Sequence, residues 1–487
     1  MFDELKQAFG KSKTSFLSYA YHPMSSGYYK IDGERFYAGQ DFRTKERFQE
    51  YMQCGFSHFF MQNVTYRGTD FATSDLKKYM DLAQEAGANK IIVFDYRLSL
   101  LAYRKDELIV PTGCEDPRLS FEDDADCKDY ISKLTFKTQA ILEEYVANCT
   151  KDYSKHSTFF GILVMDEPSY KSFPSIALVY KAIKKSCPTA YIHCNLLPLA
   201  ENVVEQYAEK YSDMYDAFRQ YLADFVETVG IDYIQYDDYP IREKEGICEI
   251  GEYNLIGLQI TADFCKERGL DFYYVTQSTA MDMRGKRVFR FPNKQDMLWQ
   301  IYHLLGFGIR RIAYYTYWRK SQNKTNHEFY PDGSAFIWQD GRKAPLYDIV
   351  RDIHEQIKRI QDVLFDYEYE NSSVIYNGYD EDTLPHVALA KTRDLKGLKV
   401  EEISEKSAFL LTRLQNATNA MYMVQNCLDS ALYEEDGKKI KLCFENCKKA
   451  FVFDFYTCEK KDLNNGKLSL TLRAGEAKFI IPYKENE

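Results

Sequence analysis

The segment VGIDYIQYDDY at residues 229–239 contains a glycine near its start. One or two residues later a largely apolar run begins, and this run ends in polar side chains. Four related segments recur along the chain: CGFSHFFMQ (54–62), AGANKIIVFDY (86–96), RGLDFYYVTQ (268–277) and FGIRRIAYYTYW (307–318). In each, a helical stretch ends near the glycine, which suits the left-handed cap that closes many helices. The run that follows is typical of a strand buried on both faces of a parallel sheet.

Three further apolar runs fit the same order without the glycine: TSFLSYAYHP (14–23), FFGILVMDEP (159–168) and AYIHCNLLP (190–198). The eight candidate strands mostly begin about 30–45 residues apart, the size of a strand–helix unit. Helical periodicity between them is found at residues 74–85, 128–148, 203–228, 253–267 and 344–362. This series predicts a (β/α)8 barrel. A doubly wound open sheet is the alternative, but it would carry a glycine-rich phosphate turn after its first strand, and YHPMSSGYYK (21–30) is no such turn.

The pattern changes near residue 366. Alternating runs such as SAFLLTRL (407–414), NAMYMVQN (419–426), KAFVFDFYT (449–457) and KLSLTLRAGEAKFIIPY (467–483) predict antiparallel strands. A chain of 487 residues is also longer than a single core usually supports. We therefore expect a barrel domain at residues 1–365 and a small antiparallel β-sandwich domain at residues 366–487.

Composition narrows the function. The formal net charge is −10 and basic residues are not clustered, which argues against a nucleic-acid partner. No run approaches the roughly 20 apolar residues of a membrane helix, so no membrane partner is expected. The start of the chain, MFDELKQAFGKSKTS, does not have the features of a signal peptide, and twelve scattered cysteines fit unpaired thiols. These features favour a cytoplasmic protein, or a secreted one if a signal peptide has been removed.

In a (β/α)8 barrel, functional side chains gather at the C-terminal ends of the strands. The predicted strand ends supply Tyr21, His22, Gln62, Asn63, Asp95, Tyr96, Arg97, Asp166, Glu167, His193, Asn195, Tyr236, Asp237, Asp238, Tyr239, Gln277, Tyr315, Tyr317 and Trp318. This set is rich in carboxylates, amides and aromatic rings. It has neither a clear metal-ligand spacing nor a nucleophile elbow, and we expect no cofactor and no metal.

Carboxylates at such a position suit hydrolysis of a glycosidic bond, in which one carboxylic acid protonates the leaving oxygen and a second group acts at the sugar carbon. Glu167 is the first candidate for the acid, because the apolar strand GILVM before it would raise the pKa of its carboxyl group. Asp166, Asp238 and Asp237 are candidates for the second group. Residues expected to bind a carbohydrate substrate are Tyr21, His22, Asp95, Asn195, Tyr236, Tyr239, Gln277, Tyr315 and Trp318.

Each candidate also has a structural alternative. Asp166 could cap a helix while Glu167 is a solvated side chain at the start of a loop, and Asp237 and Asp238 could cap the helix that follows them. Asp95 could be a buried anchor for Arg97, and Trp318 could pack within a loop. His22 and His193 could be barrel histidines whose hydrogen bonds are already satisfied.

The segment FFGILVMDEPSY (159–170) resembles the fourth strand of barrel glycoside hydrolases. The large retaining clan has Asn-Glu there, and its nucleophilic glutamate ends the seventh strand, where this chain has Gln277. The Asp-Glu pair is instead similar to that of β-N-acetylhexosaminidases and related galactosaminidases. That resemblance implies that Glu167 is the acid/base, that Asp166 orients the substrate's own attacking acetamido group, and that Tyr236 or Tyr239 holds the acetamido oxygen. YIQYDDYP (233–240) also resembles the sixth strand of chitinase-type barrels, and the C-terminal segment resembles the small β domains of bacterial glycosidases.

The leading hypothesis is thus a glycosidase acting on a mono- or oligosaccharide glycoside. One alternative is a metal-dependent lyase or isomerase that uses Asp95, Asp166 and Asp238. Another is a non-catalytic carbohydrate-binding protein, which the missing carboxylate of the seventh strand would favour.

Overall fold

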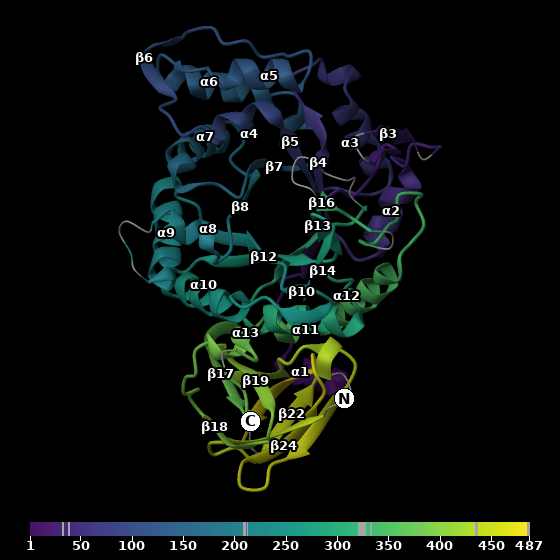
Figure 1. Cartoon of the computed structure of the whole chain (residues 1–487), viewed down its shortest axis with the longest axis vertical. Coiled ribbons are helices and arrows are strands. Elements are labelled where there is room, and N and C mark those ends of the chain that lie inside the picture. The colour runs from purple at the N-terminus through teal and green to yellow at the C-terminus, as the bar shows by residue number, and fades with distance from the viewer. Residues whose placement is uncertain are drawn as a thin grey trace.

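The computed structural model describes residues 1–31, 34–37, 39–207, 211, 213–319, 328–331, 334–380, 382–433 and 437–484. It confirms the predicted (β/α)8 barrel followed by a β domain (Figure 1). The barrel strands, in chain order, are β1 (Leu17–Ala20), β4 (His58–Tyr66), β5 (Ile91–Asp95), β7 (Phe159–Asp166), β8 (Tyr191–Asn195), β9 (Tyr233–Asp237), β12 (Asp271–Gln277) and β15 (Arg311–Tyr315). Each falls within, or at the edge of, one of the eight predicted segments.

The eight strands are parallel and are paired in the order β8-β7-β5-β4-β1-β15-β12-β9. A parallel bridge between Leu196, which directly follows β8, and Tyr236 of β9 nearly closes the sheet into a barrel. The helices around it are α2 (Lys45–Gln53), α3 (Asp75–Glu85), α6 (Gln139–Thr150), α7 (Phe173–Ser186), α9 (Met214–Val229), α10 (Asn254–Arg268), α11 (Lys294–Gly306) and α12 (Pro345–Leu364). Gly230 (φ 77°) and Gly269 (φ 66°) end α9 and α10 in the left-handed conformation expected of such caps.

The helix predicted at residues 128–148 is in fact two helices. They are α5 (Asp124–Ile131) and α6, and the segment between them runs beside β6 (Ile109–Cys114). There the N–H of Phe136 donates to the carbonyl of Leu108 at 2.7 Å, and the N–H of Cys114 donates to that of Thr135 at 2.8 Å. These bonds between residues distant in the chain outweigh the local helical periodicity. Shorter elements of the barrel domain include α4 (Tyr96–Ala102), α8 (Glu201–Glu205) and the hairpin of β2 (Tyr28–Ile31) and β3 (Glu34–Tyr37).

Three connections at the C-terminal face of the barrel form a second sheet, which we call the mouth sheet. Its antiparallel strands are β10 (Ile241–Lys244), β11 (Ile247–Ile250), β13 (Met281–Met283), β14 (Lys286–Phe289) and β16 (Glu328–Phe329). They follow β9, β12 and β15, so the mouth sheet stands beside the C-terminal ends of these three barrel strands.

The β domain contains a six-stranded and a three-stranded antiparallel sheet with an apolar cluster between them. Its elements are β17 (Glu368–Asn377), α13 (Pro385–Ala388), β18 (Leu398–Ile403), β19 (Ser407–Gln415), β20 (Ala420–Asn426), α14 (Ser430–Tyr433), β21 (Lys438–Phe444), β22 (Lys449–Phe453), β23 (Cys458–Asp462), β24 (Lys467–Leu472) and β25 (Ala477–Tyr483). The boundary expected at residues 365 and 366 lies in the connection between α12 and β17.

The β domain packs against α10 and α11, and helix α1 (Phe2–Phe9) packs on α12. Both chain ends lie at this domain in Figure 1. Among the described residues, no helix has the length and apolar character needed to cross a membrane.

One buried ion pair stabilises the barrel wall. Asp95 and Arg97 are 0% and 2% exposed, and two hydrogen bonds, of 2.7 and 3.0 Å, join their side chains. We expect Asp95→Ala to lower the free energy of unfolding by about 3–5 kcal/mol, because it leaves a buried guanidinium without its counter-charge. Chemical denaturation would measure this. As a control, Asp129→Ala breaks the Asp129–Lys133 pair, whose side chains are both 72% exposed, and should cost less than about 1 kcal/mol. Equal losses in the two variants would contradict the prediction.

Candidate active site

Three adjacent barrel strands bring two carboxylates and an amide together at the barrel mouth. Asn195 ends β8 and lies between Asp166, which ends β7, and Asp237, which ends β9. Its Nδ2 atom donates to Asp237 Oδ1 at 2.6 Å and to Asp166 Oδ1 at 3.2 Å. Since both oxygens bind the same nitrogen, they are at most about 6 Å apart.

Asp237 is the most enclosed of these acids, at 6% exposed. Its burial raises its pKa well above the usual range of an aspartate, and the nearby negative charges of Glu167 and Asp166 add to this effect. Hydrogen bonds from Tyr239 and Asn195 partly oppose the shift. A carboxyl group in such surroundings tends to stay protonated, which is the state a general acid needs.

Glu167 does not have the apolar surroundings that the sequence predicted for its carboxyl group. Strand β7 ends at Asp166, and Glu167 has a left-handed backbone (φ 49°) and an exposed side chain. Its N–H donates to the carbonyl of Asn195 at 2.8 Å. Glu167 therefore stands on the solvent side of the acidic group and contributes negative charge to the surroundings of Asp237.

Aromatic rings surround the acids. Tyr239 packs on Tyr315 with ring centroids 5.4 Å apart and an interplanar angle of 31°, and its hydroxyl group bonds to Asp237. The ring centroid of Tyr315 lies 5.9 Å from that of Tyr21 and 6.3 Å from that of His22. Tyrosines of this kind offer an apolar face and a polar edge, which suits the faces and hydroxyl groups of a sugar.

A polar network fills the barrel beneath this mouth. Nε2 of His193 lies 3.0 Å from the hydroxyl of Tyr21, and its Nδ1 lies 3.3 Å from that of Tyr19. Gln235 accepts from Tyr19 and donates towards Asn195 Oδ1 at 3.5 Å. Burial, with a contribution from the charge of Arg311, lowers the pKa of His193 to about 3. The imidazole is therefore neutral near pH 7, and it lies in hydrogen-bonding contact with Tyr21 and Tyr19.

Five predicted site residues differ from expectation because they face other parts of the protein. Asp95 pairs with Arg97, the structural alternative considered above. Asp238 accepts from Asn254 Nδ2 at 2.7 Å, behind the sheet. Tyr236 packs on Phe218 and Phe272, Trp318 packs on Phe42, and Gln277 bonds to the N–H and carbonyl of Ile241.

For Asp95, Tyr236 and Asp238 the physical reason is that side chains alternate along a strand. Trp318 lies beyond the end of β15, and Gln277 is held by the backbone of β10. Gln235 and Asp237 face the interior of the barrel, so Tyr236 and Asp238 face the helices. Because Asp95 and Asp238 are held by other groups, the three aspartates of the metal-dependent alternative do not converge. Among the described residues, no group of three or more His, Cys, Asp or Glu side chains could hold a metal ion.

Two tyrosines of the mouth were not among the predicted residues. The Tyr103 hydroxyl, which comes from the end of α4, donates to the carbonyl of Asp166 at 2.8 Å. The Tyr330 hydroxyl lies 3.1 Å from that of Tyr315. Both belong to long connections that have no periodic pattern, so nothing in the sequence singles them out. The side chains of Gln62 and Asn63 lie outside the described part of the structure.

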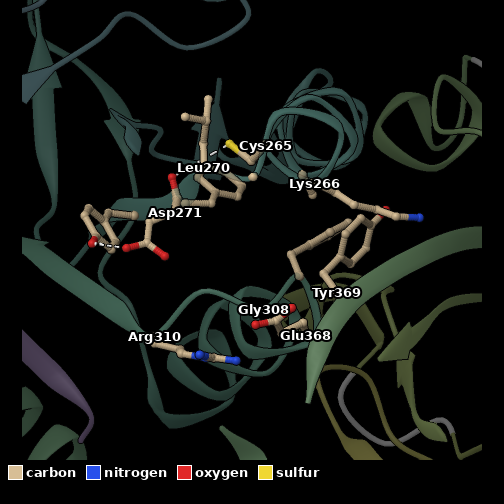
Figure 2. Close-up of a pocket in the computed structure, with 13 residues that line it drawn as sticks. Cys265, Lys266, Leu270, Asp271, Gly308, Arg310, Glu368 and Tyr369 are labelled. Carbon is tan, nitrogen blue, oxygen red and sulfur yellow. Dashed lines mark hydrogen bonds between the residues drawn. The ribbon is translucent and has the colours of Figure 1, made fainter. Parts of the chain in front are cut away.

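A cavity of about 260 Å³ lies at the opposite face of the barrel, between α10, β12, β15 and the start of β17 (Figure 2). Three of its polar side chains are bound within the protein. Asp271 accepts from Tyr273 at 2.7 Å, Lys266 donates to the carbonyl of Glu370 at 2.6 Å, and Arg310 donates to that of Tyr367 at 3.0 Å. None of the predicted site residues lines this cavity.

No protein-family model and no curated protein matches the sequence. Solved structures with a similar fold include an α-amylase from Geobacillus thermoleovorans complexed with acarbose, 12% identical, with 97% of this chain and 99% of that chain covered and a TM-score of 0.49. A GH27 β-L-arabinopyranosidase from Geobacillus stearothermophilus is 9% identical, with 98% and 97% covered and a TM-score of 0.49. A family 5 mannosidase from Rhizomucor miehei is 11% identical, with 72% and 93% covered and a TM-score of 0.39. These neighbours are glycoside hydrolases, but identities and scores this low assign no activity to this chain.

Proposed function

We propose that the chain is a glycoside hydrolase in which Asp237 is the general acid and Asp166 is the ionised carboxylate that acts at the sugar carbon. The observation that carries this proposal is the hydrogen bonding of both acids to the single amide of Asn195. The two acids differ in environment: Asp237 is enclosed, whereas Asp166 is only partly buried. Two carboxyl groups whose surroundings separate their proton affinities can divide the roles of acid and base.

The separation supports a double displacement. Retaining glycosidases hold their carboxyl groups about 5–5.5 Å apart, whereas inverting enzymes leave about 6.5–9.5 Å for a water molecule. The limit of about 6 Å set by the shared amide favours the shorter class. In this scheme Asp166 attacks the anomeric carbon while Asp237 protonates the departing oxygen. Asp237 then removes a proton from the water that releases the sugar from Asp166.

The cluster of tyrosines around Tyr315 supports a carbohydrate substrate. The geometry does not select one sugar, so the test uses a broad panel of glycosides. Hydrolysis of 4-nitrophenyl glycosides, N-acetylhexosaminides included, is the first measurement. Turnover with net retention of configuration is the expected result. Absence of turnover on every glycoside, with retained binding of sugars, would favour a non-catalytic carbohydrate-binding protein instead.

Glu167→Gln separates this assignment from the sequence-based one, in which Glu167 is the acid. We expect kcat/KM to stay within about tenfold of wild type, below the 10²–10⁴-fold that a general acid contributes. The variant removes one of the charges that raise the pKa of Asp237, so that pKa falls. Since the reaction needs protonated Asp237, the basic limb of the kcat/KM profile should move to lower pH.

The control is Glu85→Gln, at an exposed glutamate on α3, which should leave the profile unchanged. A loss of several orders of magnitude at every pH in Glu167→Gln would transfer the role of acid to Glu167. Activity restricted to N-acetyl substrates would then favour the acetamido-assisted route, with Asp166 orienting the acetamido group.

A further inference from the structure

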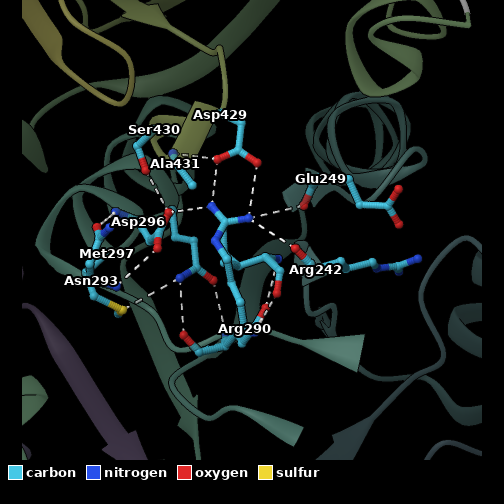
Figure 3. A network of polar contacts seen from close by, with 12 residues as sticks. Arg242, Glu249, Arg290, Asn293, Asp296, Met297, Asp429, Ser430 and Ala431 are labelled. Atoms are coloured by element: carbon cyan, nitrogen blue, oxygen red, sulfur yellow. Dashed lines mark hydrogen bonds and ion pairs between the residues drawn. The ribbon is translucent and has the colours of Figure 1, made fainter. Parts of the chain in front are cut away.

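A buried arginine joins the barrel, the mouth sheet and the β domain (Figure 3). Arg290 follows β14 and is 6% exposed. Its Nη1 and Nη2 atoms bind the two carboxylate oxygens of Asp429 at 3.1 and 2.7 Å, and Nη2 also binds Asp296 Oδ1 at 2.8 Å. Asp296 belongs to the first turn of α11, and Asp429 lies between β20 and α14 of the β domain. The guanidinium thus forms a buried ion pair between the two domains.

The same guanidinium holds the backbone of the mouth sheet. Nη1 donates to the carbonyl of Arg242 on β10 at 3.2 Å and to that of Glu249 on β11 at 3.4 Å. The N–H of Arg290 donates to the carbonyl of Ile241 at 3.3 Å. The planar fork of an arginine can bind several acceptors in a fixed geometry, which the single ammonium group of a lysine cannot do. The hairpin β10–β11 and the carboxylate of Asp429 therefore share one anchoring point.

A short series of contacts links Arg290 to Asp237, the candidate acid. Phe289 immediately precedes Arg290, and its ring centroid lies 5.4 Å from that of Tyr239, at 68°. Tyr239 in turn bonds through its hydroxyl to Asp237. Tyr239 also lies in the connection between β9 and β10, so both its backbone and its ring depend on the mouth sheet.

We propose that Asp429 and Arg290 are positioning residues, through which the β domain fixes the mouth sheet and thereby the placement of Tyr239 against Asp237. The contacts that carry this proposal do not depend on the reaction catalysed. Its consequence for turnover rests on the proposed function, so the first test uses the fold alone.

The first test is backbone hydrogen exchange in the full chain. In Asp429→Asn and in Arg290→Lys, we expect amides of β10, β11, β13 and β14 to exchange about tenfold faster or more than in wild type, since each variant weakens a buried charged hydrogen bond. Arg290→Lys keeps the positive charge beside both carboxylates, so it tests the proposal even if Asp429→Asn fails to fold.

The matched control is Asp263→Asn. It weakens another ion pair between the domains, Asp263–Arg393 at 2.6 Å, which joins α10 to the β domain away from the mouth sheet. Exchange in the mouth sheet should stay at the wild-type rate in this variant. Unchanged exchange in Asp429→Asn and Arg290→Lys would overturn the proposal. So would an equal increase in Asp263→Asn, since the effect would then be general loosening of the two domains.

The second test is kinetic and uses the best glycoside substrate. Arg290→Lys should lower kcat by about tenfold to a hundredfold with little change in KM, because a small displacement of a catalytic group slows the chemical step more than it weakens binding. Asp263→Asn should leave both constants near wild type. A normal kcat together with accelerated exchange would overturn the link to Asp237. If wild type hydrolyses no glycoside, the proposed function fails, and hydrogen exchange still decides whether the anchor exists.

Discussion

Asp237→Asn should lower kcat/KM by about 10³–10⁴-fold on a glycoside with a poor leaving group, near the top of the range for removal of a general acid. An asparagine is close in shape to a protonated aspartate and can still accept the hydrogen bond from Asn195 Nδ2. The substitution therefore removes the transferable proton with little change in packing. A 4-nitrophenyl substrate, whose leaving group needs little protonation, should lose much less.

Asp238→Asn is the matched control for this variant, because it changes the neighbouring residue by the same atoms. Asp238 accepts a hydrogen bond from Asn254 behind the sheet, and an asparagine oxygen can accept the same bond. We expect activity close to that of the wild type, because the substitution touches no reacting group and keeps this hydrogen bond. A larger loss in Asp238→Asn than in Asp237→Asn would show that the wrong aspartate had been assigned.

The stability of Asp237→Asn gives a test that does not depend on turnover. Because the pKa of Asp237 is higher in the folded than in the unfolded chain, the protein loses stability as pH rises from the unfolded value through the folded one. The asparagine cannot ionise and avoids that loss. Thermal unfolding should therefore show a higher Tm for the variant than for wild type at neutral pH, and a smaller difference at pH values below the usual aspartate pKa.

The barrel could be predicted from the sequence because its strands are buried on both faces and leave long apolar runs. Gly230 and Gly269, whose left-handed conformation ends a helix, marked where two of these runs begin. The split of the predicted helix at 128–148 could not be predicted in this way. It depends on the pairing of residues 135–136 with β6, which is a contact between segments far apart in the chain.

The candidate site could be predicted only in part. The strand ends pointed to Asp166, Asn195 and Asp237, but the sequence pattern did not separate Asp237 from Asp238 and placed Asp238 first. Alternation along β9 separates them once one interior residue, such as Gln235, is known. Side chains from long connections, such as Tyr103, have no periodicity that a sequence could reveal, and their position depends on how those connections fold.

Asp166→Asn should abolish steady-state turnover, with a fall of about 10⁴-fold or more, because a carboxamide is a far weaker nucleophile than a carboxylate and removal of a nucleophile is among the largest single losses in enzymes. In the wild type, a 2-fluoro glycoside with a good leaving group should form a stable adduct. Fluorine destabilises the cationic transition states of both steps, and the good leaving group speeds only the first. Mass spectrometry of peptides containing residues 159–170 would then find the added sugar on Asp166.

In Asp237→Asn the same reagent should still label Asp166, because an activated leaving group needs no proton from the acid. An adduct on Glu167 would instead make that residue the nucleophile, and turnover without any adduct, with inversion of configuration, would contradict the double displacement. The shared amide of Asn195 is why retention is expected: it keeps Asp166 too close to Asp237 for a water molecule to attack between them.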